Sequence, residues 1–471
     1  MTYILASQIG CALDCDLSSG QNKHTGGPAT DDGPRINAAL AGATADHPIT
    51  LIIDGSALIS GLFLPSGGHW AIAGLGCGTG FFVQSGTNND GIHNGPPDAA
   101  IPFDPGPPAP ARGANVSLSN FTVNGNQGNG SDGTSTSGKR QGVFGRVWYC
   151  GINLMNLDNI TIENVVVVNT PAYHVRLSNV GNVKVSGCMF WSKGGNTDGL
   201  HFDGPANDIA ISGCGFRTGD DSIALNCPEG YTGDILRVAV DNCRFDSLSL
   251  MRLYTTTGGA HPVNFRIDSV SVSNCTGRLE VPAFLLGLAS GSVPEAIDNL
   301  TISDCSLTAP TVLGVAENFG SISLQNVTFN SPSVLAGFLA PAGPFDPFIG
   351  ASLSFQNCRI SGGGGVATLL GNGSRIDQVS FNGFTAQNSP LLDAFLWGSI
   401  GQVILDSVDS SKIVAPTNDF ASIGSVSGAG VLGTGWEFPD EVMVDGVPYI
   451  SASTGLPSIK NNGVVQLYGT P

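Results

Sequence analysis

Two short segments of this chain carry acidic side chains at matching positions. The first reads NTDGLHFD and contains Asp198, and the second reads TGDDSIAL and contains Asp220 and Asp221. Aligning the apolar residues that follow, Leu200 with Ile223, places Asp198 level with Asp221. If the segments lie on neighbouring strands, three carboxylates meet on one face about 4.8 Å apart.

Carboxylates packed this closely are suited to acid–base chemistry. Like charges at short range raise the pKa of at least one of the groups. Glycoside hydrolysis needs one protonated carboxyl as acid and one ionised carboxylate as base or nucleophile, and the cluster supplies both. The alternative is that these segments are turns in which Asp bonds to its own backbone.

A repeated phrase defines the elements that position the cluster. Each copy is a short alternating apolar strand, then Asn, Gly or a similar turn residue, and then one apolar slot. Cysteine fills the slot at Cys188, Cys214, Cys243, Cys275, Cys305 and Cys358, and Phe121, Val165, Val327, Phe384 and Val408 fill it elsewhere. Such a repeat predicts a solenoid whose units bury their inner faces only when stacked.

Successive slots from Val165 to Val408 lie 22 to 32 residues apart. This repeat length favours an all-β fold, a right-handed single-stranded parallel β-helix. A β-propeller is the alternative, but its blades are longer, about 40–50 residues. The slot is expected to face the core, because cysteine alternates there with Val and Phe and behaves as a small apolar residue. A disulfide is left open only among the cysteines outside the slot: Cys11, Cys15, Cys77, Cys150 and Cys227.

The ends of the chain are expected to differ from the solenoid. Residues 30–41 predict a short capping helix that begins at Asp31 or Asp32, with Ile36 and Leu40 on its apolar stripe. Residues 1–427 are assigned to the β-helix, with excursions at 96–110 and 124–140. Residues 428–471 are assigned to a C-terminal cap or tail, because the repeat fades there.

Composition limits the partners. A formal net charge of −18 without a basic run argues against nucleic acid. No apolar stretch approaches the ~20 residues that a membrane span needs. We expect a carbohydrate partner and a monomer or homotrimer. No cofactor or metal is expected; Ca²⁺ held by the aspartates is the alternative. A secreted or periplasmic location is expected, although the first residues lack a basic signal-peptide region.

The two acidic segments resemble a known family. NTDGLHFDG followed by TGDDSIAL is similar to the polygalacturonase-like glycoside hydrolases of family 28, and ATDDGPRINAAL near the N-terminus resembles the opening of many polysaccharide-degrading β-helices. The resemblance implies a right-handed parallel β-helix and hydrolysis with inversion. It implies Asp220 as general acid and Asp198 and Asp221 as bases that activate water.

The chain departs from that family at two motifs. The family's Gly-His-Gly would fall one repeat later, where this chain has FDSLSL from Phe245. The family's Arg-Ile-Lys would fall one repeat further, where the candidate stretches contain Arg278 and Glu280 or read PAFLL. We therefore expect a polysaccharide or oligosaccharide substrate that is either pectin-related or neutral.

Side chains around the carboxylates are candidates for substrate binding. Along the strand after Asp198, Leu200 and Phe202 should face inward and His201 and Asp203 outward. The full set of candidates is Tyr173, His174, Arg176, Trp191, His201, Asp203, Asn226, Arg252 and Tyr254. Arg176, His201, Asn226 and Arg252 are expected to form one outward column. The alternative is an ordinary solvent-facing row of polar residues.

Two rival functions remain open at this level. One is a polysaccharide lyase or epimerase on the same fold, with a Lys, Arg, His or Tyr base. The other is a glycan-binding β-helix without turnover, of the phage-tail or adhesin type.

Overall fold

The structure is a computed structural model. It describes residues 2–87, 89–95, 109–127, 149–192, 194–255, 265–287, 296–331, 339–341, 348–362, 374–386, 398–408, 422–427, 443–444 and 447–448. The predicted excursion at 96–110, the loop at 124–140 and the C-terminal segment 428–471 lie mostly outside these residues. Their assignments therefore stay predictions.

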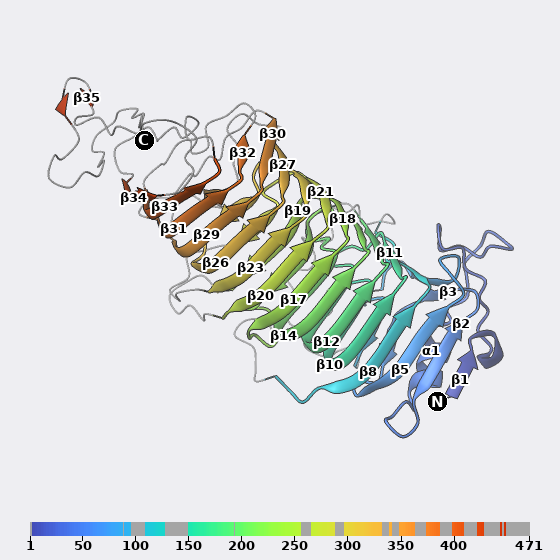
Figure 1. The fold of residues 1–471 in the computed structure, drawn as a ribbon. Helices are drawn as coiled ribbons and strands as arrows, with labels where there is room; N and C mark the ends of the chain where they lie inside the picture. The colour runs from blue at the N-terminus through green and yellow to red at the C-terminus, as the bar shows by residue number, and fades with distance from the viewer. Residues whose placement is uncertain are drawn as a thin grey trace. The chain divides into compact units, whose positions relative to one another are not determined.

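The chain is an all-β, right-handed parallel β-helix with one α-helix, which confirms the predicted fold class. It forms two compact units, Met1–Leu250 and Met251–Pro471. Each unit is built from parallel strands that stack coil upon coil (Figure 1).

The first unit contains the N-terminal helix and the acidic segments. Its elements are β1 (Thr2–Leu5), the 3-10 helix η1 (Ser7–Ile9), α1 (Gly33–Leu40), β2 (Ile49–Ile53), β3 (Ser56–Ile59), β4 (Leu62–Leu64), β5 (Gly68–Gly74), β6 (Gly80–Val83), β7 (Ile92–Asn94), β8 (Gly113–Ser119), β9 (Thr122–Asn124), β10 (Ile152–Glu163), β11 (Val166–Val168), β12 (Val175–Ser186), β13 (Met189–Trp191), β14 (Leu200–Ser212), β15 (Gly215–Arg217), β16 (Asp221–Asn226), β17 (Ile235–Asp241) and β18 (Arg244–Ser247).

Two parallel sheets form the walls of this unit. The short strands β3, β6, β9, β11, β13, β15 and β18 pair in that order in one sheet. In the other sheet β12 pairs with both β10 and β14, and β14 pairs with β16 and then β17. Within the pair β14–β16, Leu200 lies opposite Ile223, so the predicted register of the two acidic segments is confirmed.

The second unit continues the same pattern of strands. β19 (Ser249–Tyr254) crosses the boundary between the units. The later strands are β20 (Ile267–Ser273), β21 (Thr276–Leu279), β22 (Phe284–Leu286), β23 (Ile297–Ser303), β24 (Ser306–Thr308), β25 (Leu313–Val315), β26 (Phe319–Gln325), β27 (Thr328–Ser331), β28 (Leu339–Pro341), β29 (Ile349–Gln356), β30 (Arg359–Gly362), β31 (Ser374–Asn382), β32 (Thr385–Ala386), β33 (Gly398–Asp406), β34 (Ser422–Ser427), β35 (Met443–Val444) and β36 (Val447–Pro448). Except for the antiparallel pair β35–β36, the pairings within this unit are parallel.

The repeated slot faces the core, as predicted. All eleven slot side chains are buried, from Phe121 to Val408. The residue before each slot has a left-handed backbone, for example Asn164 (φ 53°), Gly187 (φ 64°) and Asn242 (φ 52°). Asn and Gly adopt this conformation at lower cost than other residues, which explains why they recur at the turn. The turn then directs the next side chain inward.

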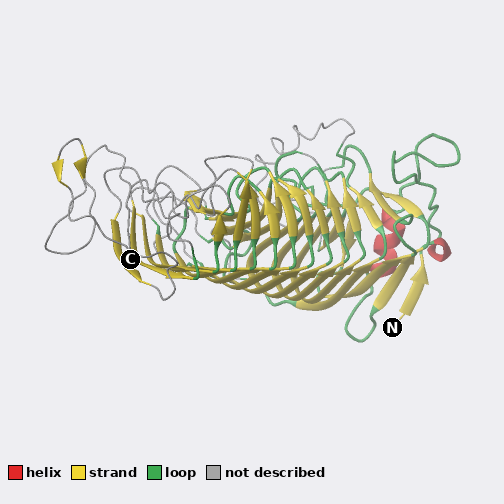
Figure 2. Ribbon diagram, turned by 45° about the horizontal axis from the view of Figure 1, so that its top comes forward, coloured by secondary structure: helices red, strands yellow, loops and turns green. Residues whose placement is uncertain are grey.

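The N-terminal helix forms where it was predicted. α1 packs against β2, β3 and β4 with Ile36 and Leu40 buried (Figure 2). Asp32 occupies the N-cap position, but its carboxylate makes no capping bond. It instead accepts hydrogen bonds from the backbone N–H groups of Ala12 (2.7 Å) and Leu13 (2.9 Å). The aspartate thus ties the preceding chain to the helix.

All eleven cysteines are thiols, so the open possibility of a disulfide outside the slot is not realised. Within the stack, the backbone N–H of Cys214 lies 3.4 Å from Sγ of Cys243. The six cysteines that fill the repeated slot are therefore part of the apolar core.

Cys214→Val should change the free energy of unfolding by less than about 1.5 kcal/mol, because volume-conserving core substitutions are tolerated and Val occupies the same slot elsewhere. Urea unfolding of variant and wild type measures this difference. The wild-type midpoint should be the same with and without a reducing agent. A midpoint that falls on reduction would contradict the thiol assignment.

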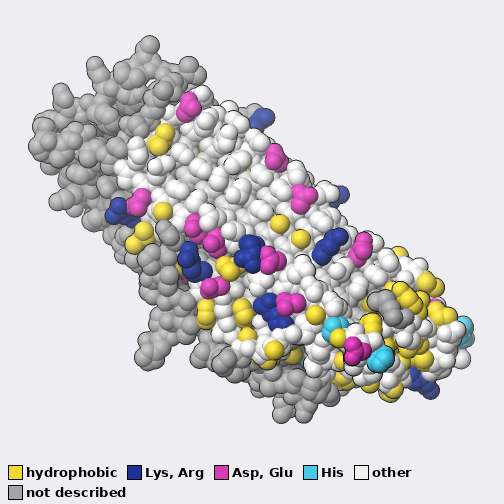
Figure 3. Space-filling model, turned by 60° about the horizontal axis from the view of Figure 1, so that its bottom comes forward, with side chains coloured by type: hydrophobic (Ala, Val, Ile, Leu, Met, Phe, Trp, Pro, Cys, Tyr) yellow, Lys and Arg dark blue, Asp and Glu magenta, His cyan; other side chains and the backbone are white. Residues whose placement is uncertain are grey.

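Charges on the described surface are mixed in sign. On the face shown in Figure 3, basic and acidic side chains lie next to one another. In the first unit, Arg237 forms a bidentate pair with Asp208 (2.6 and 2.9 Å), and Arg112 bonds to Asp158 at 2.9 Å. Among the described residues, no helix has the length and apolar character of a membrane span.

Candidate active site

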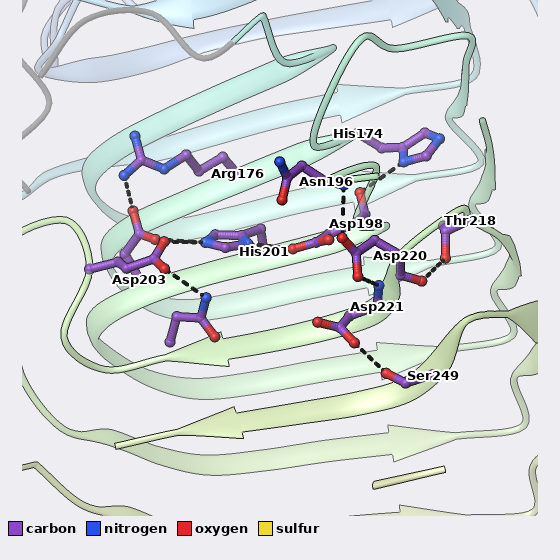
Figure 4. A network of polar contacts seen from close by, with 12 residues as sticks. His174, Arg176, Asn196, Asp198, His201, Asp203, Thr218, Asp220, Asp221 and Ser249 are labelled. Carbon is purple, nitrogen blue, oxygen red and sulfur yellow. Dashed lines mark hydrogen bonds and ion pairs between the residues drawn. The ribbon is translucent and has the colours of Figure 1, made fainter. Parts of the chain in front are cut away.

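The acidic side chains come from connections between the two sheets of the first unit. Asp198 lies between β13 and β14, Asp220 lies between β15 and β16, and Asp221 begins β16. The two connections belong to successive coils, so the backbone repeat sets their separation. Figure 4 shows the three carboxylates converging from these connections.

Hydrogen bonds join the two connections to each other. The Thr197 hydroxyl donates to the Gly194 carbonyl (2.7 Å) and accepts from the Gly219 N–H (2.9 Å). The Asn196 N–H donates to Oδ2 of Asp220 at 2.7 Å. A Cβ atom on Gly219 would lie 2.4 Å from Gly194 backbone atoms, so this approach requires glycine. The positions of the carboxylates therefore follow from the backbone.

The three carboxylates are close enough to share one small ligand. Asp198, Asp220 and Asp221 each offer one oxygen, and these oxygens lie within 4.8 Å of one another. Some point is then no farther than about 2.8 Å from all three, the length of an O–H···O hydrogen bond. Asp198 and Asp221 are buried, whereas Asp220 is only partly buried. The convergence is the arrangement that the sequence predicted.

Burial and charge act together on Asp198. Burial raises the pKa of its carboxyl to about 7, and the charges of Asp221 and Asp220 act in the same direction. His201 opposes this rise, because Nδ1 of its ring lies 2.7 Å from Oδ2 of Asp198. Asp198 therefore changes its protonation near neutral pH, where a general base is most effective.

Asp221 is held by the coil that follows. The hydroxyl of Ser249 donates to Oδ1 of Asp221 at 2.5 Å (Figure 4). Ser249 belongs to the FDSLSL stretch, where the family resemblance implied Gly-His-Gly. In this chain a serine hydroxyl from that stretch contacts the cluster.

His201 lies between two groups of carboxylates. Its Nδ1 faces Asp198, and its Nε2 lies 3.0 Å from both Oδ1 of Asp203 and Oε2 of Glu229. The ring stacks on Tyr173 with centroids 3.8 Å apart and an interplanar angle of 12°. Although burial opposes the charged form, hydrogen bonds to these three carboxylates hold the pKa of His201 well above its usual value.

Arg176 and Asp203 form a fully buried ion pair beside His201. The loop from Cys227 to Gly233 lies against Asp203, since a Cβ on Gly230 would meet the side chains of Ser178 and Asp203. The same loop carries Glu229. Arg176 and Asp203 are fully buried, and Asp203 contacts His201, so a role of either in substrate binding stays a prediction.

His174 and Tyr173 also have structural contacts. The backbone N–H of His174 and its Nδ1 both lie 2.8 Å from the Asp198 carbonyl oxygen, and its ring packs on Phe190. Burial lowers the pKa of His174 to about 4, so its ring is neutral and Nδ1–H can donate. His174 therefore fixes the backbone of Asp198, and substrate contact by this residue or by Tyr173 stays a prediction.

The predicted outward column is correct for one pair and wrong for Asn226. Arg176 lies opposite His201, as expected. Ala224 lies opposite His201 on the next strand, and Asn226 pairs with Asp203. Asn226 instead donates to Oε1 of Glu229 at 3.1 Å. The column failed because Asn226 lies one alternation further along β16 than the column required.

The remaining candidates lie at the edges of this arrangement. Trp191 ends β13, is half exposed, and has the guanidinium of Arg217 over its ring at 5.2 Å. Arg252 and Tyr254 lie on β19 in the second unit, partly exposed, next to the buried Met251 and Leu253. Their roles as substrate-binding residues stay predictions.

Sequence reasoning missed Glu229 and Ser249. Glu229 lies in a loop, where no periodicity indicates which coil it contacts. Ser249 could have been found by continuing the alignment of the acidic segments by one coil. Two groups, Asp198 with Asp220 and Asp221, and His201 with Asp203 and Glu229, have atoms spaced for a metal ion. A Ca²⁺ ion at the first group stays a prediction.

Comparisons with known proteins agree with this geometry. Residues 109–245 match the model of the family described as Glycosyl hydrolases family 28. A search of the curated proteins finds no match. Among solved structures, the Yersinia enterocolitica family 28 exopolygalacturonase is similar with a TM-score of 0.56 and 13% identity, over 87% of this chain and 78% of that chain.

A tailspike protein of the E. coli bacteriophage HK620, solved as a double mutant, is also similar. Its TM-score is 0.53 with 9% identity, over 90% of this chain and 78% of that chain. At these identities the structural likenesses establish the fold. The matched segment contains both acidic motifs. Residues 109–245 are thus similar in sequence to glycosyl hydrolases family 28, and the chain shares the parallel β-helix fold over most of its length.

Proposed function

We propose that this protein is a glycoside hydrolase and that Asp198, Asp220 and Asp221 form its catalytic centre. The observation that carries the proposal is the convergence of their oxygens within 4.8 Å, two from buried carboxylates and one from a partly exposed carboxyl. A water molecule at the point equidistant from these oxygens would lie within hydrogen-bond distance of all three. Because water donates only two hydrogen bonds, the third carboxyl must be protonated to complete the arrangement.

Exposure divides the roles among the three residues. The general acid must reach the glycosidic oxygen, and Asp220 is the member with access to solvent. Its proton passes to that oxygen as the bond to the anomeric carbon breaks. The water oxygen bonds to the anomeric carbon, and its proton passes to the ionised Asp198 or Asp221. This direct attack gives inversion of the anomeric configuration.

The charges around the cluster favour an uncharged sugar at the point of cleavage. Among the described residues of the first unit, Arg176 and His201 are the cations that adjoin the site, and both bond to carboxylates. The carboxylates at the site outnumber these two cations, and the whole chain has a net charge of −18. A uronate carboxylate would be repelled. We therefore propose a neutral polysaccharide or oligosaccharide as substrate, acted on outside the cytoplasm.

A glycan panel with product analysis tests this function. The protein should release new reducing ends from a neutral glycan, without unsaturated products that absorb in the ultraviolet. Proton NMR of the first product should show the anomer opposite to that of the substrate bond. The panel compares acidic glycans with neutral ones: polygalacturonate and pectin on one side, and a neutral glucan or mannan on the other.

Each other outcome points to a different function. Unsaturated ends would identify a lyase. Binding without turnover on the whole panel would identify a glycan-binding β-helix. Cleavage of polygalacturonate in preference to every neutral glycan would keep the hydrolase and overturn the proposed substrate class.

A further inference from the structure

His201 occupies a position that the assigned catalytic roles do not explain. It is almost completely buried, and it is the second residue of β14, directly after Leu200. Figure 4 shows its ring between Asp198 on one side and Asp203 on the other. It contacts one carboxylate of the catalytic cluster directly and joins that carboxylate to a second acidic group.

The contacts at the ring determine its charge. Nδ1 lies 2.7 Å from a carboxylate oxygen of Asp198, and Nε2 lies 3.0 Å from carboxylate oxygens of Asp203 and Glu229. An ionised carboxylate only accepts hydrogen bonds, so each ring nitrogen needs a hydrogen to make these contacts favourable. A ring that carries both hydrogens is an imidazolium. The geometry therefore places a positive charge against Asp198.

The groups that face His201 from other elements sustain this charge. Tyr173 covers one face of the ring, and Arg176 lies opposite on β12, paired with Asp203. Ala224 lies opposite on β16 and contributes no charge. Glu229 approaches from the loop after β16. The signs alternate from Asp198 through His201 and Asp203 to Arg176, which stabilises charged groups out of contact with water.

Asp198 also faces two carboxylates of its own cluster. Asp220 and Asp221 have oxygens within 4.8 Å of it and favour its protonation. The Nδ1 contact of His201 is to Asp198. The cation therefore opposes the protonation of Asp198 that these two carboxylates favour.

We propose that His201 is a positioning residue that favours the ionised form of Asp198, with Asp203 and Glu229 holding His201 as a cation. This proposal rests on the proposed function, since it explains how a buried carboxylate beside two others can act as a base. The FDSLSL stretch lacks a histidine, and His201 supplies one to the cluster from a different strand. Because Glu229 contacts His201, the loop from Cys227 to Gly233 also takes part in holding the cation.

The test uses two variants that weaken the positive charge beside Asp198 to different extents. His201→Asn keeps a donor near Nδ1 but removes the positive charge. The acidic limb of the pH profile of kcat/KM should then move about 1–3 pH units higher, the usual effect of losing an adjacent opposite charge. Activity should return at alkaline pH. The loss of a catalytic residue would not allow this recovery. Glu229→Gln removes a carboxylate that holds His201 as a cation, so the limb should move in the same direction by a smaller amount.

A second readout does not depend on turnover. The melting temperature of each protein is compared with that of the same protein carrying Asp198→Asn, across pH 4 to 9. The pH at which this difference appears reports the titration of Asp198, and it should shift in the same directions as the kinetic limb. If the protein hydrolyses no glycan, the melting comparison still tests the role of His201.

The control is Asp208→Asn, which removes the same charge from an exposed pair with Arg237 further along β14. It should leave both titrations unchanged. If His201→Asn does not fold, Glu229→Gln decides the question, because its side chain is 16% exposed and lies in a loop. Titrations that stay within error of wild type in Glu229→Gln, or that move to lower pH, would overturn the proposal.

Discussion

Asp220→Asn should lower kcat by about 10²–10⁴ on the glycan that the wild type hydrolyses, the usual contribution of a general acid. Asn cannot deliver a proton to the glycosidic oxygen, yet it keeps the size of Asp and an oxygen that can accept the N–H of Asn196. The affinity for an oligosaccharide of the same glycan should stay within a few-fold of wild type. Steady-state kinetics and calorimetric titration measure the two quantities.

Asp246→Asn is the matched control for this experiment. Asp246 is an exposed aspartate on the next coil, 3.5 Å from the guanidinium of Arg217. Its replacement changes the net charge equally and should leave kcat unchanged. If Asp220→Asn kept more than a tenth of the wild-type rate, Asp220 would not be the acid.

Asp198→Asn should make the protein more stable than the wild type above pH 7. Burial and the neighbouring carboxylates raise the pKa of Asp198 from 3.8 to about 7 in the folded state. The folded protein then holds this proton more tightly than the unfolded chain does. Wild-type stability consequently falls as the pH rises from about 4 to about 7 and stays at the lower level beyond it.

The variant lacks this titration, so its advantage should grow across that pH range and reach the order of 2–4 kcal/mol. Melting temperatures from pH 4 to 9 measure it, with Asp246→Asn as the control for net charge. The variant should at the same time be inactive. An advantage that is equal at pH 4 and pH 9 would mean that Asp198 is not protonated near neutral pH.

The sequence was sufficient for those parts of the site that depend on the repeat. Asp198 and Asp221 were placed on one face because the apolar alternation of β14 and β16 specifies a single register, which the pairing of Leu200 with Ile223 confirms. The core slots were found for the same reason. A shift of one residue would have exposed every apolar side chain on the strand.

The parts that depend on connections could not be read in this way. His174 precedes β12, where the inward–outward alternation does not yet apply, and its ring packs against Phe190. Glu229 reaches His201 because a loop folds back across the sheet. Arg176 lies on β12, where the alternation predicted an outward side chain, yet it is fully buried and pairs with Asp203.

The division between repeat and loop has a consequence for how such a protein diversifies. The distance between Asp198 and Asp221 is fixed by main-chain pairing of neighbouring coils, and core substitutions change it little. The loop from Cys227 to Gly233 has no comparable restraint from the repeat. Selection for a new sugar can therefore remodel the loop while the three carboxylates keep their spacing. Proteins that evolve from this one could then bind different sugars with the same arrangement of carboxylates.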